Sequence, residues 1–564
     1  MGPTENGRRV KRLGYLAVAL AIALTACTRV ATTQQGPDTG TGGSAAPGQR
    51  HPWTHPGVLR IASLSDPDSL NPLLGTFQVD TDLSMFWGGY LFNYSDRNEL
   101  VPELATAVPT VENGGIAKDG LTITYHLREN VQWHDGEPFE SGDVAFTWRA
   151  IMNPNNNVQT RTGYDLISAI DTPDKHTAVV HLKQRFAPFV NTFLTMSATT
   201  YPVLPKHVLA KYPDINRVPF NSAPVGTGPF IVKEWHRGQI LRMVANPHYW
   251  RGAPKLKEVT YQAIPDENTL TTSIRSHDID LWSNASSATY PGASHVPDTH
   301  ALLTPFTQYA FVGFNLSRAP LNELAVRKAI AYGTDRARLL QTATYGVNVP
   351  GEGDQPRFSP VYNTALQPIP YDQFKAKATL DAAGWRVGPD GVRTKNGKRL
   401  HLVFTTSAGS ALGNRMAVLL QSALREVGIE TEVKAYATAQ MFSNYAAGGI
   451  LQAGKYDLEF SSWVNGTDPD DSTGVMCDQV PPSGQNIYRF CNHELDSLEK
   501  VALTTYDPAQ RKKAYDRIQE ILVDQLPWLT LWFNRRFDVV SVDLKNYKPA
   551  HAVTTFWNTW EYDI

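Results

Sequence analysis

Cysteine is scarce in this chain, with three among 564 residues. A dense disulfide framework is therefore excluded, and a sizeable hydrophobic core must hold the fold together. The sequence also lacks an H-E-x-x-H motif and any compact histidine cluster. It gives no sign of a zinc protease or a nickel-type metal site, and we expect no metal and no cofactor.

An excess of positive charge is missing too. Lys and Arg number 52 against 54 Asp and Glu, for a net charge of −2. No domain-wide basic surface follows from this balance, so we expect no nucleic-acid partner.

Only one long apolar run occurs, LGYLAVALAIALTAC at residues 13–27. It is short for a membrane span of about 20 residues, and the basic run RRVKR precedes it. This pattern predicts a secretory signal peptide over residues 1–26. Its end, LTAC, resembles a bacterial lipobox, which implies cleavage before Cys27 and lipidation of its sulfur. The alternative is an ordinary signal peptide followed by an accidental cysteine.

Residues 27–56 are rich in Gly, Ser, Thr and Pro and predict a flexible tether. An anchored, exported domain at the periplasmic or extracellular face of a membrane is the expected arrangement. Beyond Cys27 the only cysteines are Cys477 and Cys491, which predict a disulfide in an exported chain. That bond closes a 15-residue loop, for which chain entropy predicts about 3 kcal/mol of stabilisation.

The rest of the composition is that of a globular protein, with 42% hydrophobic and 19% charged residues. Its length predicts about two to four domains. Strand-like alternation over 58–64, 121–127 and 176–182 is interspersed with amphipathic helices over 321–333, 414–428 and 507–527. We expect Asn322 and Asp507 to cap two of these helices, and Gly428 to end the third. The pattern favours an α/β fold.

Catalytic motifs are weak. G-x-S-x-G does not occur, and SLEK at 497–500 fits the S-x-x-K pattern without the companion S-D-N and K-T-G motifs. In WHDGEPF, Gly136 and Pro138 indicate a turn, so His134 is expected to be structural; Ser141 is expected to cap the following helix. GTGPF at 226–230 lacks the lysine of a phosphate loop. Its two glycines indicate that the backbone passes close to a neighbouring segment before a strand. We do not expect an enzyme.

Several long stretches carry a family resemblance. They are LVPELA (100–105), YHLRENVQWHDGEPFESGDVAFTWRAIMNP (125–154), PVGTGPFIVKEW (224–235), NPHYWRGAPKLKEVTY (246–261), FNLSRAPLNELAVRKAIAYGTDR (314–336) and NHELDSLEKV (492–501). Together these stretches resemble the family 5 extracellular solute-binding proteins, which are the peptide-, dipeptide- and nickel-binding receptors of ABC importers. The resemblance covers about residues 57–560.

The resemblance implies a two-lobed clamshell of the periplasmic-binding-protein type (type II, cluster C) with an extra inserted domain. Lobe one would comprise 57–95, 199–297 and 528–564, the inserted domain 96–198, and lobe two 298–527. Closure of the lobes would bury a ligand. A monomer that captures a peptide or similar polar solute for a permease and ATPase complex is implied; a sugar or opine receptor, a sensor and an envelope chaperone remain alternatives.

Peptide binders of the family clamp the ligand's α-amine with an Asp in a W-x-x-D arrangement. Here Trp463 is followed by Val464, Asn465 and Gly466, and Gly466 occupies the Asp place. A buried ammonium without a carboxylate is costly. Either Asp468 substitutes as the clamp, or the ligand's amine is absent, blocked or held elsewhere.

Other ligand contacts are implied by matching places in the family. These are the loop SDPDSLN (65–71) with Asp66, then Trp87, Phe314, Asn315 and Arg415. For each aromatic residue, packing in the core is the alternative role. Arg415 lies with Asn414 at an expected helix start, which could attract an anion, or it is a solvated surface charge.

Overall fold

The computed structural model describes residues 50–197, 200–551 and 554–564, and residues 52–564 form one compact unit. The predicted signal peptide, Cys27 and most of the predicted tether lie outside the described residues. Within the described ranges, no helix is both long enough and apolar enough to cross a membrane.

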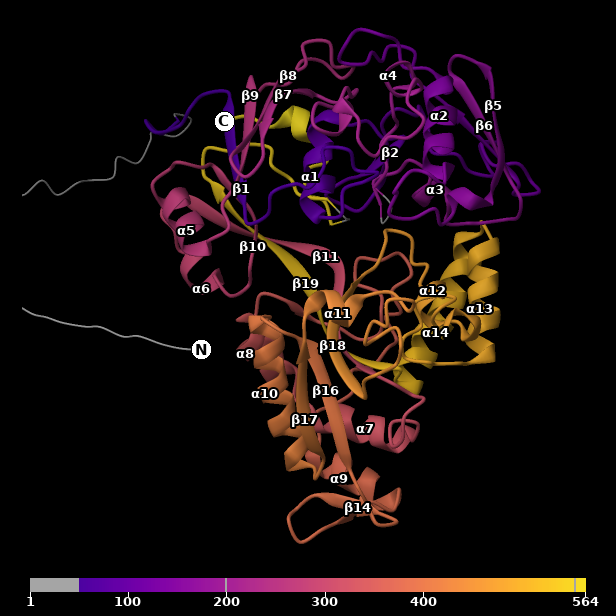
Figure 1. Ribbon diagram of the computed structural model, residues 1–564, viewed down its shortest axis with the longest axis vertical. Helices are drawn as coiled ribbons and strands as arrows, with labels where there is room; N and C mark the ends of the chain where they lie inside the picture. Colours follow the sequence, from indigo (N-terminus) through magenta and orange to yellow (C-terminus); the bar gives the residue numbers. More distant parts are fainter. Residues whose placement is uncertain (1–49, 198–199, 552–553) are drawn as a thin grey trace, which may run out of the picture. The chain divides into compact units, whose positions relative to one another are not determined.

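Strands of one large sheet dominate the folded unit (Figure 1). Its members are β1 (Val58–Ser63), β7 (Phe230–His236), β8 (Ile240–Ala245), β9 (Glu258–Ala263), β10 (Leu281–Ala285), β11 (Thr299–Phe314), β12 (Val349–Pro350), β16 (His401–Ser407), β17 (Glu430–Tyr436), β18 (Leu458–Val464) and β19 (Trp528–Ser541). The strand order is β17-β16-β18-β11-β19-β10-β1-β9-β8-β7, and β12 pairs with β19. Parallel pairing of β1 with β9 and β10, and of β16 with β17 and β18, gives each half the character of an α/β sheet.

Three small sheets complete the strands: β2 (Phe92–Tyr94) with β3 (Leu100–Pro102), β4 (Thr122–His126) and β5 (Ile167–Asp174) on either side of β6 (Thr177–Leu182), and β13 (Arg386–Val387), β14 (Arg393–Lys395) and β15 (Lys398–Arg399). The helices are α1 (Gln78–Trp87), α2 (Ser141–Met152), α3 (Phe189–Thr192), α4 (Lys206–Leu209), α5 (Glu267–Arg275), α6 (Tyr290–Ala293), α7 (Leu324–Gly333), α8 (Arg336–Thr344), α9 (Gln373–Ala382), α10 (Ala411–Glu426), α11 (Thr438–Phe442), α12 (Ser472–Val475), α13 (His493–Thr504) and α14 (Pro508–Gln525).

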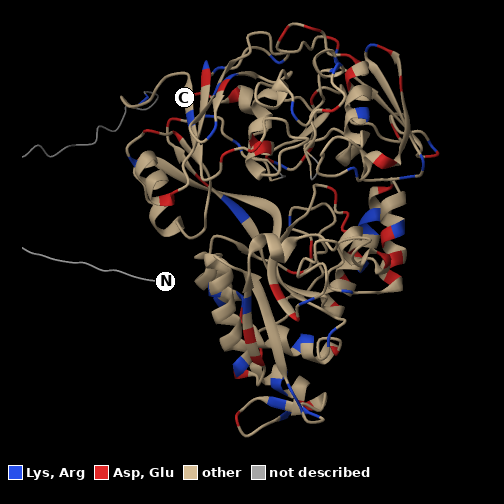
Figure 2. Ribbon diagram, in the orientation of Figure 1, with Lys and Arg blue, Asp and Glu red and all other residues tan. Residues whose placement is uncertain are grey.

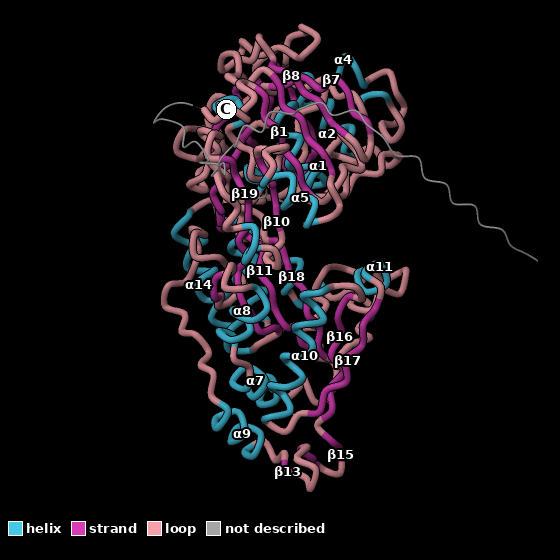
Figure 3. Tube along the Cα trace, turned by 90° about the vertical axis from the view of Figure 1, so that its left-hand side faces the viewer, coloured by secondary structure: helices cyan, strands magenta, loops and turns pink. Residues whose placement is uncertain are grey.

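Two long antiparallel strands, β11 and β19, run between the lobes (Figure 1, Figure 3). Residues 299–305 of β11 pair with 535–541 of β19, and residues 311–313 pair with 528–530; the register shifts between Pro305 and Tyr309 and again between Ala310 and Phe311. At one end, Phe537 and Val539 pack in a lobe-one core. At the other, Leu529 and Trp532 pack in a lobe-two core. The expected lobe boundaries at 298 and 528 fall at the starts of β11 and β19. The change from the lobe-one core to the lobe-two core lies within the strands, because β19 contributes residues to both cores.

The segment 96–198 contains the β4-β6-β5 sheet and α2. It is built into one continuous core with the lobe-one strands: Ile123 and Val144 belong to the same buried cluster as Leu59 and Ile61. The chain's last residue, Ile564, lies in this cluster as well, and its carbonyl oxygen accepts a hydrogen bond from Gly57 N at 3.0 Å. Lobe one is thus assembled from segments that are distant in sequence.

The helix starts agree in part with the sequence patterns. Asp507 caps α14 by accepting hydrogen bonds from Ala509 N and Gln510 N, and Pro508 is its first residue, as predicted. Two other predicted caps are wrong. Asn322 lies in a turn in which its backbone N–H donates to Arg318 O, and the residue before α7 is Glu323, whose side chain makes no capping hydrogen bond.

Ser141 is the other incorrect cap, because it is already the first residue of α2 and donates its hydroxyl to Asp174 O. The helix predicted over 414–428 begins earlier, at Ala411. The Ser410 hydroxyl accepts from Gly413 N and fixes that start. Gly428 follows the helix at φ +87°, as a helix-ending glycine does.

The two glycines of GTGPF allow a close backbone approach. A Cβ on Gly226 would lie 1.7 Å from Trp87 O, and one on Gly228 would lie 2.7 Å from the Trp87 carbonyl carbon. The WHDGEPF segment forms the predicted turn, with Gly136 at φ +93° and Trp133 N donating to Glu137 O. Both motifs are therefore structural, because they position the backbone beside α1.

Candidate functional site

The end of β18 is an open part of the sheet in lobe two, although β18 is not the terminal strand. Trp463 pairs across from Tyr309 of β11, and Val464 pairs across from Gln308. On its other side, β18 pairs with β16 only at Leu458 and Glu459. Residues 460–464 therefore have one strand neighbour among the described strands, and the side chains of Trp463 and Val464 are each 39% exposed. An exposed strand edge of this kind can accept an extended chain.

A cavity of about 50 Å³, here called the β18 cavity, lies beside this strand end. Its wall includes Trp463 and the carboxyls of Asp470 and Asp471. Burial raises the pKa of Asp471 far above its ordinary value, and the carboxyls of Glu499 and Asp354 beside it act in the same direction.

A second cavity, of about 170 Å³ and here called the α1 cavity, lies in lobe one. It is lined by residues after β1, including Ser65, and by Gln78 and Asp82 of α1. The Asp82 carboxylate accepts a hydrogen bond from Gln78 Nε2 at 3.1 Å. Burial raises the pKa of Asp82, although the nearby positive charge of Arg536 opposes this change.

A third cavity, of about 440 Å³ and here called the Asp468 cavity, lies between segment 96–198 and lobe two. Asn191 Nδ2 donates to Asp468 Oδ2 at 2.9 Å, and Tyr94 donates to Asn191 Oδ1 at 2.8 Å. The same carboxylate receives two hydrogen bonds from Arg511, at 2.9 and 2.7 Å. Asp468 thus has a guanidinium partner, and it lines a different cavity from Trp463.

Of the other expected site residues, Asp66 lies near a cavity, whereas Trp87 and Phe314 are buried in the lobe cores. Asp66 accepts a hydrogen bond from Gly238 N in the turn between β7 and β8, next to the α1 cavity. Trp87 and Phe314 are buried in the cores of lobes one and two. Their side chains are not presented to a ligand in this structure.

Asn315 and Arg415 are engaged in local structure. Asn315 is fully buried and donates to Gly454 O and Tyr456 O. Arg415 lies in the second turn of α10 and donates to Ala343 O at 3.0 Å.

Within the strand-end segment, Asn465 is buried as well. Its side chain donates to Asp354 O at 2.6 Å. Gly466, at the place of the amine-clamping Asp, is half-buried. The structure therefore brings Trp463, Val464 and the acidic loop together, while most of the other expected contacts serve packing.

Several side chains that line these cavities were not expected from the sequence. They are Tyr309, Tyr488 and Trp528 at the β18 cavity, Asp82 and Asn284 at the α1 cavity, and Tyr94, Asn191 and Arg511 at the Asp468 cavity. The aspartate run after Trp463 pointed to the loop that lines the β18 cavity, but not to these three aromatic residues. The others come from distant segments and carry no local motif.

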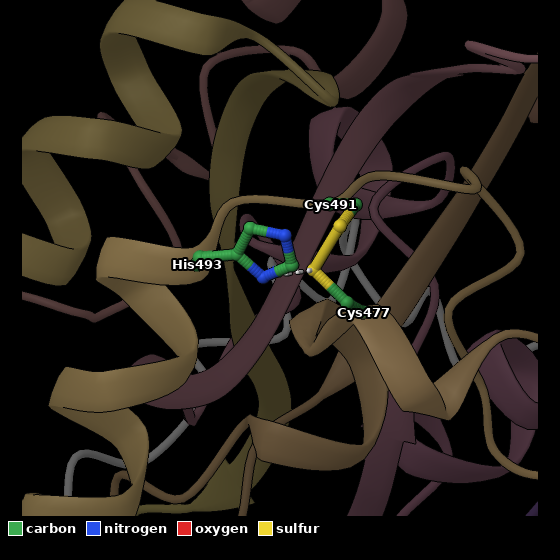
Figure 4. A group of neighbouring side chains, drawn as sticks. All are labelled: Cys477, Cys491 and His493. Atoms are coloured by element: carbon green, nitrogen blue, oxygen red, sulfur yellow. Dashed lines mark hydrogen bonds between the residues drawn. A yellow bond between two sulfur atoms is a disulfide. The ribbon is translucent and has the colours of Figure 1, made fainter.

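Cys477 and Cys491 form a disulfide, as the cysteine count predicts. With His493 they make the one group of three clustered metal-type donors among the described residues (Figure 4). His493 Nδ1 lies 3.9 Å from Cys477 Sγ. Because both sulfurs are bonded to each other, neither provides the thiolate that a metal ion would need.

Comparisons with known proteins agree with this architecture. Residues 99–481 match the model for bacterial extracellular solute-binding proteins, family 5 (middle region). Protein XP55 of Streptomyces lividans is 30% identical over 519 residues, which cover 91% of this chain and 87% of the relative. The oligopeptide-binding protein AppA of Bacillus subtilis is 25% identical over 87% of this chain and 89% of its own length.

Solved structures share the fold. NikZ from Campylobacter jejuni, in complex with Ni(L-His), matches with a TM-score of 0.75 and 24% identity, over 91% of this chain and all of that one. AppA from Bacillus subtilis, in complex with a nonapeptide, matches with a TM-score of 0.72 and 23% identity, over 90% of this chain and 99% of its own. The expected two-lobed solute-binding-protein fold is confirmed.

Proposed function

Because the chain belongs to the bacterial extracellular solute-binding proteins of family 5, we propose that it captures peptides for an ABC importer and does so outside the cytoplasm. It acts as a receptor and not as an enzyme. Peptide binding by the relative AppA supports this assignment. The ligand is held between lobe one and lobe two, and closure of the lobes is the signal to the permease and ATPase complex.

The observation that carries the proposal is the open edge of β18. Among the strands that the structure describes, none pairs with one side of residues 460–464, which include the exposed Trp463 and Val464. A peptide in extended conformation can pair its backbone with this edge, and its side chains alternate toward the cavities. Backbone pairing recognises a peptide without strict dependence on its sequence.

The β11–β19 pair supports lobe closure, because both strands run between the lobes. The register shifts in the β11–β19 pair weaken the ladder where the core packing changes from one lobe to the other. A ligand that touches both lobes stabilises the closed conformation by the difference in its affinity for the two states.

The test is ligand-dependent thermal stability, measured with peptides of two to nine residues, with sugars and with nickel–histidine. At a concentration of 100 times Kd, a peptide stabilises the folded state by about 2.7 kcal/mol. Peptides of the same sequence in which every backbone amide is N-methylated form the control, since none of their amides can donate to the strand edge. Stabilisation by nickel–histidine or by a sugar, with none by any peptide, contradicts the proposal.

A non-peptide solute is the second candidate. Gly466 provides no carboxylate for a ligand amine, and the relative NikZ binds Ni(L-His). A nickel complex, sugar or opine would be recognised by side chains of the α1 cavity instead of the strand edge. Stabilisation by nickel–histidine, a sugar or an opine, with none by any peptide, would favour this candidate.

We further propose that the protein is a monomeric lipoprotein, anchored through Cys27 after removal of residues 1–26. The lipobox-like LTAC and the apolar run before it support this proposal. Several acyl chains on one residue give firm anchoring, since each buried CH₂ contributes about 0.8 kcal/mol. Cys27→Ser should move the protein from the membrane fraction to the soluble fraction. If the variant stays with the membrane, lipidation at Cys27 is not the anchor.

A further inference from the structure

The Cys477–Cys491 disulfide lies at the surface of lobe two, beside the first residue of α13 (Figure 4). Cys491 and His493 are exposed, and Cys477 is half-buried. Structural disulfides in exported proteins usually resist reduction, whereas exposed disulfides are the labile ones. This bond is therefore accessible to a dissolved thiol.

One imidazole nitrogen lies between a sulfur atom and a carboxylate. His493 Nδ1 is 3.9 Å from Cys477 Sγ and 3.6 Å from Asp496 Oδ2. The other oxygen of Asp496, Oδ1, accepts a hydrogen bond from Cys477 N at 3.0 Å, which holds the cysteine and the carboxylate side by side. A third group that orients an imidazole beside a sulfur is a recurring arrangement in thiol chemistry. In its protonated form, the His493 ring presents an N–H to the Cys477 sulfur.

His493 supplies the positive charge beside the disulfide. Among the described residues, the acid within ion-pair distance of His493 is Asp496, on the same helix. The neighbouring Glu494 is directed instead to Arg517 of α14, with Nε 2.7 Å from its carboxylate. On the side of the disulfide, the exposed Asp478 accepts a hydrogen bond from the side chain of the residue that follows it. The guanidinium on α14 is thus engaged with another carboxylate.

The arrangement determines which sulfur a thiol attacks. A thiolate, RS⁻, reaches the exposed Cys491 sulfur and forms a bond to it as the bond between the two cysteines breaks. The electron pair of the broken bond remains on the Cys477 sulfur as a thiolate. A protonated imidazole stabilises a neighbouring thiolate, and a more stable thiolate leaves faster.

We propose that Cys477–Cys491 is a thiol-exchange site, at which a low-molecular-weight thiol forms a mixed disulfide with Cys491 while His493 stabilises the Cys477 thiolate. A second thiolate then attacks the small-molecule sulfur of the mixed disulfide and releases RSSR and the Cys491 thiolate. In total, two RSH are oxidised to RSSR, and the protein disulfide is reduced to two thiols. The proposal is independent of which solute the receptor binds.

The experiment follows the reaction of glutathione and of 2-mercaptoethanol with the oxidised, folded chain. The chain carries Cys27→Ser, so that no other cysteine reacts. An alkylating quench and peptide mass spectrometry identify the first product, in which the thiol adduct should be on Cys491 and the alkyl group on Cys477. The rate should rise in proportion to the thiol concentration. A first adduct on Cys477, or a rate independent of thiol concentration, which indicates reaction only after unfolding, would overturn the proposal.

Two histidine variants test the imidazole. His493→Gln removes the ring at the disulfide, and His401→Gln removes a partly exposed histidine of β16 in the same lobe. After correction for the thiolate fraction of the reductant, His493→Gln should exchange about three- to tenfold more slowly than the parent at pH 5.5. His401→Gln should match the parent. Histidine side chains are protonated below about pH 6.5, so the difference should shrink at pH 8.

A third variant separates charge from a merely structural role. His493→Lys keeps a positive charge at both pH values, so it should exchange as fast as the parent at pH 5.5 and faster than the parent at pH 8. Equal corrected rate constants for the parent and His493→Gln at both pH values would overturn the proposal. The same conclusion would follow if His493→Lys were as slow as His493→Gln at pH 5.5.

Discussion

Arg511 binds the Asp468 carboxylate through both terminal nitrogens, with Nη1 2.9 Å from Oδ2 and Nη2 2.7 Å from Oδ1. Asn191 donates to the same carboxylate from segment 96–198. An aspartate with these partners is poorly placed to bind a ligand amine. It is instead well placed to join lobe two to segment 96–198.

Asp468→Asn should therefore reduce stability more than ligand affinity. Both side chains of the pair are largely buried, and loss of one charge from a buried pair costs about 3 kcal/mol. Glu494→Gln breaks an exposed pair with Arg517 and should change stability far less, because exposed ion pairs contribute little. Urea unfolding measures both effects. A large loss of affinity for an amine-bearing peptide, with stability intact, would restore Asp468 as the clamp.

Gly226→Ala should destabilise the protein by about 3 kcal/mol or more. The new methyl group would overlap the backbone oxygen of Trp87, which cannot move without shifting the end of α1. Gly292→Ala adds the same methyl group into open space and provides the control. Thermal unfolding compares the two variants, and equal melting temperatures would contradict the expected clash.

Reduction of the Cys477–Cys491 bond should cost about 3 kcal/mol, since the disulfide closes a 15-residue loop. Cys477→Ser combined with Cys491→Ser should show the same loss without reductant. The wild type in dithiothreitol is the matching measurement. If the reduced wild type and the double variant are as stable as the oxidised protein, the disulfide does not contribute to the stability of the folded state.

Glu459 predicts a pH dependence of stability. Burial raises its pKa from 4.5 to about 8. Between these values the folded state holds a proton that the unfolded state has released, so this residue's contribution to stability falls as pH rises from about 4.5 to about 8. Glu459→Gln has no such proton. Its stability relative to the wild type should therefore increase between pH 5 and pH 8.5, as measured by urea unfolding; a constant difference would contradict the assignment.

Much of the fold follows from local sequence. Asp507 and Pro508 are adjacent and define the start of α14 by themselves, and the alternation at 58–64 corresponds to β1. The incorrect caps arise where a neighbouring turn decides the start, as at Asn322. Local patterns do not contain that information.

The candidate site was less predictable, because its contacts join distant segments. Nothing near Asp468 in sequence indicates that Arg511, 43 positions later, neutralises it. Phe314 is located on the expected strand, but the direction of its side chain is set by lobe-two packing. The aspartate run after Trp463 lies beside a cavity, but the aromatic side chains of β11 and β19 that line the same cavity are far from that run in the sequence.

The position of β19 affects how the protein must fold during synthesis. β19 lies between β10 and β11 in the sheet, although residues 528–541 follow all the other strands of that sheet in the sequence. Until they emerge, the strands on either side have unpaired edges, and unpaired edges promote aggregation. The central part of the sheet can form only after residue 541 has been made, which favours late completion of the sheet over stepwise folding of the two lobes.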